Sequence, residues 1–322
     1  MARKALDLHC DTLMKVAKNG NLDENPKSHV SLKGLRDGGV ALQCFADFVP
    51  TGMFPKGFRK TLSGMMFNSY YKKYQKMMAY HSDILFPVLK AADIDKAGVD
   101  GKIGVLLTIE DGGVMGDKLE NVQKYYDMGV RLVTLTWNHP NDIGHPNSKD
   151  PELMAKGLTD FGKDVVREME RLGMVIDVSH VSDGVFWDVA EMATKPFLAS
   201  HSNSRAMCGH TRNMTDEMII KLAEKGGVMG LNIGPEFLKE ESTDSRIEDM
   251  VRHILHIREI AGSDVIALGS DFDGIHGNLE VGGPQDWPKL EKALLEAGLT
   301  EEELDKMWFG NAQRVLRAVL GD

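Results

Sequence analysis

Cysteine and long apolar runs are scarce in this chain of 322 residues, and its 38 basic residues are outnumbered by 48 acidic ones. The only cysteines are Cys10, Cys44 and Cys208, and an odd number without paired spacing argues against a disulfide framework or a zinc knuckle. No apolar run reaches the roughly 18 residues of a membrane-spanning helix. The formal net charge of -10 argues against a nucleic-acid partner, because such proteins carry a basic surface.

Several common catalytic signatures are also missing. The chain has no Walker A sequence, no dinucleotide-binding glycine fingerprint and no nucleophile elbow around a serine. Its first residues contain no apolar stretch of the kind found in secretory signal peptides. We therefore expect a cytoplasmic protein that binds neither membranes nor nucleic acids.

The sequence does contain a series of short apolar runs that are rich in β-branched residues. Hydrophobic residues make up 42% of the chain, enough for a large core. Each run is bounded by glycine, proline or polar residues, which predicts a buried β-strand. The eight predicted strands are 5–9, 40–48, 103–109, 131–136, 174–178, 196–200, 227–232 and 265–269.

Segments with helical periodicity lie between most of these strands. Strands that alternate with helices pair in parallel, and eight such units favour a closed barrel over an open sheet. We predict an α/β fold, a (β/α)8 TIM-type barrel formed by a single domain of residues 1–322. The predicted helices are 119–128, 159–172, 183–193, 215–225 and 245–261, followed by two C-terminal helices at 287–299 and 300–320.

Two regions interrupt this alternation. A loop at 50–58 precedes a long helical stretch, 60–83, that is rich in Met, Tyr and Lys. Its aromatic and basic residues could form a nucleic-acid face, but the acidic net charge favours a helix that covers the barrel mouth or contacts a second copy. The oligomeric state stays open, with a homodimer through 60–83 as one hypothesis. The loop 138–151, rich in Pro, Asn, Asp and Gly, follows the fourth strand and should lie on the active face.

Ionisable residues stand at the ends of five predicted strands. The carboxyl ends of parallel barrel strands converge on one face, where catalytic residues lie. Buried carboxylates and imidazoles without partners are costly, and a divalent metal would supply a partner. The candidate residues are His9, Asp11, Glu110, His180, His201 and Asp271.

Six candidate ligands exceed what one tetrahedral zinc needs, which predicts two metal ions. Glu110 would bridge the ions, with His9 and Asp11 on one and His180 and His201 on the other. Asp271 would either act as a general base for the nucleophilic water or ligate weakly.

Each candidate also has an ordinary structural explanation when it is taken alone. Glu110 could cap the following helix, and a single histidine at a strand end is more often hydrogen-bonded than a ligand. His29, His81, His253 and His256 lie in predicted loops or helices, so we interpret them as structural. The joint occurrence at separate strand ends is what favours a shared metal site.

The segments that carry these residues are distinctive in combination. They are Asp7-Leu8-His9-Cys10-Asp11-Thr12, Ile109-Glu110-Asp111-Gly112, Leu135-Thr136-Trp137-Asn138, Asp177-Val178-Ser179-His180, Ser200-His201-Ser202 with Arg205-Ala206, Arg212-Asn213, and Gly269-Ser270-Asp271-Phe272-Asp273-Gly274. In identity and order they resemble the membrane dipeptidase (renal dipeptidase) family of zinc peptidases, nearly from end to end.

The resemblance implies a barrel of the metal-dependent amidohydrolase kind that cleaves dipeptides with a hydroxide bridging two zinc ions. It implies the same ligand sets, with Glu110 shared, and Asp271 as the acid/base residue. Arg212 matches the residue that grips the substrate carboxylate, a role that suits the planar guanidinium. Family members tolerate a D-residue in the second position, so we expect L,D- as well as L,L-dipeptides as substrates.

Two alternatives remain at this stage. Another metal-dependent amide or ester hydrolase, such as an N-acyl-amino-acid deacylase or a lactonase, would use the same chemistry. A metal-binding protein without catalytic activity is a different class, against which the complete ligand set argues.

The sequence departs from the animal enzymes at the fourth strand. Those enzymes place a histidine, which positions the scissile carbonyl, where this chain has Trp137. Either His139 binds the substrate in its place or the metals alone polarise the carbonyl. The animal enzymes are also secreted and lipid-anchored, whereas this chain shows neither signal, so we expect a bacterial-type cytoplasmic relative.

Overall fold

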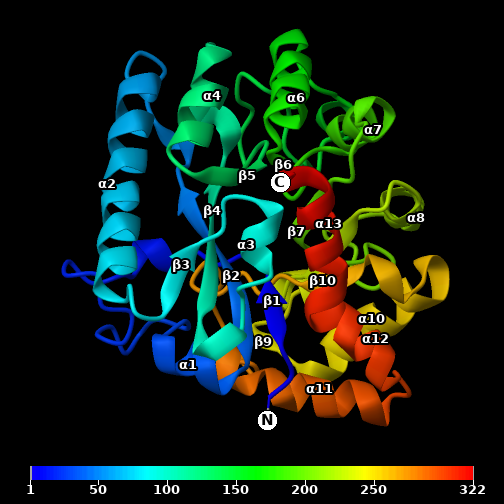
Figure 1. Cartoon of the computed structure of the whole chain (residues 1–322). Helices are drawn as coiled ribbons and strands as arrows, with labels where there is room; N and C mark the ends of the chain where they lie inside the picture. The colour runs from blue at the N-terminus through cyan, green and yellow to red at the C-terminus, as the bar shows by residue number, and fades with distance from the viewer. Residues whose placement is uncertain (1, 322) are drawn as a thin grey trace.

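Eight parallel strands close into a barrel at the centre of the computed structural model, which describes residues 2–321 (Figure 1). Every predicted barrel strand is confirmed, and most are slightly shorter than expected. Around the ring they are β1 (Ala5–Asp7), β2 (Val40–Phe48), β4 (Ile103–Glu110), β5 (Val130–Thr134), β6 (Val175–Asp177), β7 (Leu198–Ser202), β8 (Val228–Leu231) and β10 (Ile266–Leu268), which returns to β1.

Three short strands were not predicted. β3 (Leu85–Pro87) pairs with the first residues of β4, outside the ring. β9 (Asp244–Ser245) and β11 (Asn278–Leu279) pair with each other as a separate two-stranded sheet. Strands of two or three residues are too short to show a period in the sequence.

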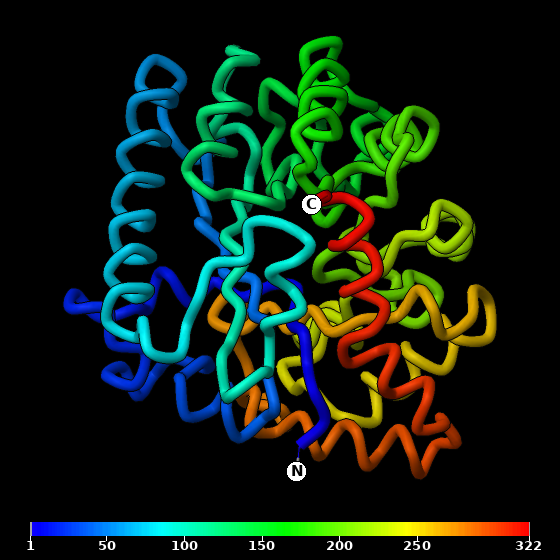
Figure 2. The backbone as a smooth tube through the Cα atoms, in the orientation of Figure 1, coloured from blue at the N-terminus to red at the C-terminus, as the bar shows by residue number. Residues whose placement is uncertain are grey.

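Helices surround the barrel, as Figures 1 and 2 show. Those that were predicted are confirmed within a few residues, including the long α2 (Arg59–Tyr80). None of the helices within residues 2–321 has the length and apolar composition needed to cross a bilayer. The α-helices besides α2 are α1 (Leu32–Asp37), α3 (Ala91–Ile94), α4 (Glu120–Asp127), α5 (Pro151–Met154), α6 (Asp160–Leu172), α7 (Asp183–Met192), α8 (Asp216–Glu224), α9 (Pro235–Leu238), α10 (Ile247–Ala261), α11 (Trp287–Glu296), α12 (Glu301–Asp305) and α13 (Asn311–Leu320).

Hydroxyl side chains begin several of these helices. The hydroxyls of Thr159, Ser182 and Thr215 each accept a hydrogen bond from a backbone N–H in the first turn. Thr300 and Glu303 form the reciprocal capping box at the start of α12. A π-helical turn, Lys306–Gly310, then joins α12 to α13, so the C-terminal region is one nearly continuous helical segment.

The interior of the barrel is apolar at one end and polar at the other. Leu6, Leu106 and Leu198 belong to a buried cluster that also contains Val315 and Leu316 of α13. The C-terminal helix therefore helps fill the apolar end of the barrel, and Figure 2 shows it crossing the barrel in red. This packing leaves the carboxyl ends of the strands for polar side chains.

Candidate metal centre

The six predicted metal-site residues meet at the carboxyl ends of the strands. His9 and Asp11 follow β1, Glu110 ends β4, and His201 lies near the end of β7. All six are buried. Their ligand atoms form three groups in which every atom lies within 4.8 Å of the others: His9, Asp11 and Glu110; Glu110, His180 and His201; and His9, His201 and Asp271.

Glu110 faces two of these groups at once. Its Oε2 atom lies 3.6 Å from Nε2 of His9. Its Oε1 atom lies 3.0 Å from Nε2 of His180 and 3.7 Å from Nε2 of His201. One carboxylate therefore has a separate oxygen for each side of the centre, which is the arrangement of a bridging ligand.

Several buried polar atoms of the centre lack a hydrogen-bond partner within residues 2–321. Both ring nitrogens of His9 are buried without a partner, and so is Oδ1 of Asp11. The Nε2 atoms of His180 and His201 approach each other to 3.1 Å. Burying such atoms without a partner is unfavourable. Imidazole nitrogens and carboxylate oxygens are the donors that zinc prefers, so this set fits a pair of divalent cations.

The electrostatics of the centre also favour added positive charge. Burial, reinforced by the charge of Asp11, raises the pKa of Glu110 to about 8. Burial raises the pKa of Asp271 to about 7, with His9 opposing and Asp11 reinforcing the shift. Burial lowers the pKa values of His180 and His201 well below the ordinary histidine value. A bound cation would reverse the carboxylate shifts and keep the imidazoles unprotonated, as ligation requires.

Two histidines are oriented by neighbouring side chains. His201 lies with Nδ1 2.7 Å from the hydroxyl of Ser200, which donates to Oδ2 of Asp177. His180 places Nδ1 3.1 Å from Oδ1 of Asn138. With Nδ1 as the donor, both rings present Nε2 to the centre as an acceptor.

Asp271 is held so that one oxygen stays available. Asn232 donates from Nδ2 to Oδ2 of Asp271 at 2.9 Å, while Oδ1 lies 3.9 Å from Nε2 of His9. The backbone of Gly274 passes close by, because a Cβ atom there would lie 2.2 Å from Oδ2 of Asp11 and 2.4 Å from Oδ1 of Asp271. Only glycine fits this approach.

The strand ends carry unusual backbone geometry. His180 and Asp271 have φ angles of 67° and 63°, and Asp111 and Asp273 also have positive φ. Such angles are uncommon for residues other than glycine and cluster at functional sites. Here they turn the chain sharply after a strand and aim the side chains of His180 and Asp271 at the centre.

The two predicted substrate-binding residues lie in different surroundings. Arg212 is buried, with one terminal nitrogen donating to the hydroxyl of Ser202 and the other to the carbonyl of His201, both at 2.9 Å. Each of these nitrogens keeps a second hydrogen, and Nε has no partner. His139 is exposed and packs against Gly52, outside the cavity lining.

A cavity of about 190 Å³ opens above the centre. Its walls include Phe48 and Trp137, whose rings pack edge to face at 4.9 Å, and Asn138. Asn138, Ser200 and Asp177 were not among the predicted site residues, although the segments that contain them stand out in the sequence. Their polar side chains beside candidate ligands were the available signal.

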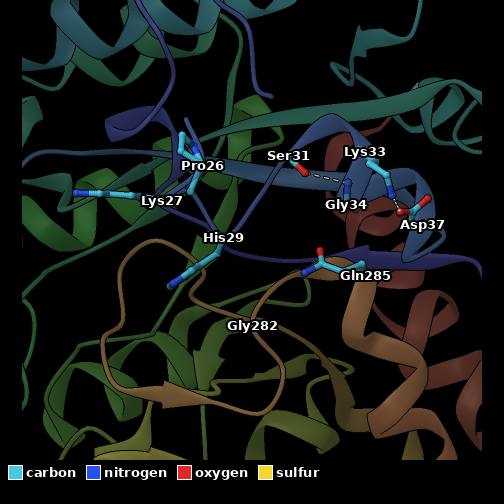
Figure 3. Close-up of a pocket in the computed structure, with 10 residues that line it drawn as sticks. Pro26, Lys27, His29, Ser31, Lys33, Gly34, Asp37, Gly282 and Gln285 are labelled. Atoms are coloured by element: carbon cyan, nitrogen blue, oxygen red, sulfur yellow. Dashed lines mark hydrogen bonds and ion pairs between the residues drawn. The ribbon is translucent and has the colours of Figure 1, made fainter. Parts of the chain in front are cut away.

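A separate polar groove of about 370 Å³, shown in Figure 3, shares no lining residue with this cavity. Ser28 and His29 line this groove and also bind the carboxylate of Asp273. Two further polar groups in view have partners, since Ser31 accepts from Gly34 and Lys33 pairs with Asp37. The groove therefore supports the loop after β10, and we assign it no catalytic part.

Comparison with known proteins places the chain in a family. A model of the membrane dipeptidase family (peptidase family M19) matches residues 2–320. An uncharacterized protein of Klebsiella pneumoniae, from the pqqA 5' region, is 36% identical over 254 residues, which cover 76% of this chain and 93% of that protein. Dipeptidase tcpJ of Claviceps purpurea is 31% identical over 248 residues, or 76% of this chain and 58% of its own.

Solved structures share the fold over the full length. A dipeptidase of family M19, named dipeptidase AC, superposes with a TM-score of 0.91 at 25% identity and covers 100% of both chains. A metallopeptidase of Rhodobacter sphaeroides superposes with a TM-score of 0.90 at 24% identity, covering 99% of this chain and 100% of its own. The chain therefore belongs to the membrane dipeptidase family of metallopeptidases, peptidase family M19.

Proposed function

We propose that this chain hydrolyses dipeptides with two divalent metal ions, zinc above all, and accepts a D-residue as well as an L-residue in the second position. The observation that carries the proposal is Glu110, whose two oxygens face two different groups of buried ligands. The Rhodobacter sphaeroides neighbour, whose structure holds a phosphinate mimic of L-Ala-D-Ala, supports the substrate class.

The distances in the centre support two ligand sets. His9, Asp11 and Glu110 would hold one ion, and Glu110, His180 and His201 would hold the other. When bound, such a pair supplies a water molecule of lowered pKa and stabilises negative charge on the carbonyl oxygen. The side chains of Ser200 and Asn138 fix the two imidazole rings on the second ion's side.

Asp271 would move the proton. Its Oδ2 is occupied by Asn232, so Oδ1 is the atom that can take a proton from the attacking water. The same atom would return the proton to the leaving amine nitrogen as the C–N bond breaks. The aromatic rings of Phe48 and Trp137 would shield this transfer from bulk water.

Arg212 would anchor the free carboxylate of the substrate. Its charge is buried, and its terminal nitrogens keep hydrogens beyond those given to Ser202 and His201. A guanidinium in this state suits two parallel hydrogen bonds to a carboxylate. This anchor selects the peptide bond that precedes the C-terminal residue as the bond to be cleaved.

The test combines metal content with hydrolysis before and after chelation. We expect about two metal ions per chain, with dipeptide hydrolysis lost to a chelator and restored by zinc. N-acyl-amino acids and lactones belong in the same assay. Hydrolysis that is indifferent to the chelator, or faster on those substrates than on any dipeptide, would overturn the proposal.

A further inference from the structure

One charged side chain in the wall of the active-site cavity has no part in the candidate metal centre. Twelve residues line this cavity, and four of them belong to the centre. Seven others carry no charge: Met14, Phe48, Trp137, Asn138, Phe237, Gly274 and Ile275. The remaining one is Glu236 of α9, which is exposed to solvent and has no ion-pair partner within the described residues.

Glu236 also borders a second, larger cavity. This second cavity has a volume of about 450 Å³, compared with about 190 Å³ for the first. Glu240 and Glu241 line it too, and Glu240 is fixed by a 2.9 Å hydrogen bond from the backbone of Gly209. Because Glu236 is common to both linings, it lies between the two cavities, and a long side chain that leaves the first cavity past Glu236 would point toward the second.

The balance of charge around this route is negative. Three glutamates line the second cavity, and the basic residues there are Lys149 and His210. Burial, reinforced by the charge of Arg212, lowers the pKa of His210, so the ring is neutral at pH 7. One lysine therefore opposes three carboxylates, which makes the route attractive to a cation.

The position of Arg212 tells which end of the substrate lies beside this route. His210 and Thr211 of the second cavity directly precede Arg212 in the chain. The guanidinium carbon of Arg212 lies 5.9 Å from the centre of the Phe237 ring, and Phe237 is the neighbour of Glu236 on α9. A substrate whose carboxylate binds Arg212 thus places the side chain of its second residue nearest Glu236.

We propose that Glu236 is a specificity-determining residue that favours dipeptides with a cationic side chain, lysine or arginine, on the second residue. This inference rests on the proposed function and adds a substrate preference to it. The cavity is partly open to solvent, so the attraction is screened and the preference should be about five- to tenfold in kcat/KM.

The experiment measures kcat and KM of the metal-loaded enzyme on four dipeptides. Ala-Lys carries the cation, Ala-norleucine has an uncharged chain of similar length, Ala-Glu reverses the charge, and Lys-Ala moves the cation to the first residue. We expect Ala-Lys to be preferred over Ala-norleucine by about five- to tenfold, mainly through KM, with Ala-Glu the poorest of the four.

Two glutamine variants locate the effect. Glu236→Gln should bring the ratio of Ala-Lys to Ala-norleucine close to one. Glu248→Gln, the matched control, changes an exposed glutamate of α10 that lines neither cavity, and it should keep the wild-type ratio.

The outcomes separate this inference from the proposed function. A metal-loaded enzyme that hydrolyses none of the four dipeptides would contradict dipeptidase activity itself. Dipeptide hydrolysis with equal kcat/KM for Ala-Lys and Ala-norleucine would overturn only the preference, and so would a preference for Lys-Ala. A preference for Ala-Lys that survives in Glu236→Gln would remove Glu236 as its cause.

Discussion

Two serines, one in the turn after β10 and one in β7, hold two buried aspartates in nearly the same way. Ser270 donates its backbone N–H and its hydroxyl to Asp7, at 2.8 and 2.6 Å. Ser200 donates the same two groups to Asp177, at 2.9 and 2.5 Å. In both pairs the aspartate ends one barrel strand and the serine belongs to the neighbouring strand or to the turn that follows it.

The two pairs differ in what the serine hydroxyl touches next. Ser200 lies 2.7 Å from Nδ1 of His201 and so fixes an imidazole that faces the centre. Ser270 contacts only backbone groups there, the carbonyl of His9 and the N–H of Phe272, both at 3.1 Å, and leaves both ring nitrogens of His9 without partners among the described residues. The His9 ring is held instead by stacking on His201, with ring centroids 3.8 Å apart. The same hydrogen-bonded pair thus orients a ligand on one side and only the backbone on the other.

The largest effect is expected from Asp271, which belongs to neither serine–aspartate pair. Asp271→Asn removes the proton acceptor but leaves both pairs intact. We expect kcat to fall by roughly 10²- to 10⁴-fold, the usual contribution of a general acid or base. Metal analysis of the same preparation should show wild-type content. Turnover at the wild-type rate would remove the proton-transfer role from Asp271.

The variants Ser200→Ala and Ser270→Ala test whether the two serine hydroxyls differ in their effect on the metal centre. Both variants remove a hydroxyl that donates to a buried aspartate, so both should lose stability, by about 1–3 kcal/mol in urea unfolding. Only Ser200→Ala frees the ring of a candidate ligand, and it should weaken metal binding by about 10- to 100-fold. A competition titration with a chromophoric chelator measures this. Equal weakening in both variants would show that orientation of the imidazole contributes nothing.

Asn138 tests the orientation of a second imidazole, that of His180, with a smaller expected effect on metal affinity. Asn138→Ala removes the acceptor for Nδ1 of His180 and should weaken metal binding by about tenfold. In Asn138→Asp a carboxylate can accept the same hydrogen bond, so affinity should return. If both variants bind metal equally poorly, Asn138 acts through packing and not through the hydrogen bond.

His253 is a buried histidine outside the metal centre, and both of its ring nitrogens have hydrogen-bond partners in the protein. It therefore serves as a reference for the histidines of the centre. Nδ1 accepts from the backbone of Ser204 at 3.2 Å, and Nε2 lies 3.0 Å from the carbonyl of Leu238. Burial lowers the pKa of His253 to about 4. The unfolded chain, with a histidine pKa of about 6.5, therefore takes up a proton first as the pH falls, and stability is lost.

The expected loss from this residue is about 1 kcal/mol between pH 7 and pH 5.5. Urea unfolding of the metal-free protein at the two pH values should show it. His253→Gln, which cannot titrate in this range, should show a smaller loss than the wild type. An identical loss in both proteins would assign the pH dependence to other groups.

The sequence was sufficient to predict the barrel and the spatial grouping of the six candidate residues. Apolar runs such as 103–109 are long enough to predict a strand. β3 has only three residues, one of them proline, and is too short to be predicted. His9, Glu110 and His201 were predicted to meet because the carboxyl ends of parallel strands always converge. That inference needs no knowledge of side-chain direction.

Side-chain direction in an irregular loop could not be predicted. Trp137, Asn138 and His139 follow one another after β5, and no period tells which of them faces the cavity. In the structure Trp137 and Asn138 line the cavity, whereas His139 is exposed and packs against Gly52. Hydrogen bonds between distant segments, such as that from Ser200 to Asp177, likewise depend on strand register, which one sequence does not reveal.

The two oxygens of Glu110 belong to one rigid carboxylate, which would couple metal binding at one side of the centre to metal binding at the other. An ion that draws Oε2 toward His9 also sets where Oε1 points, toward His180. In the proposed two-ion centre, binding at one position would therefore change the affinity of the other, and the change would be reciprocal. We expect cooperative loading, so that half-loaded molecules are rarer than independent sites would give. At limiting metal, such a protein would divide into empty and fully loaded molecules.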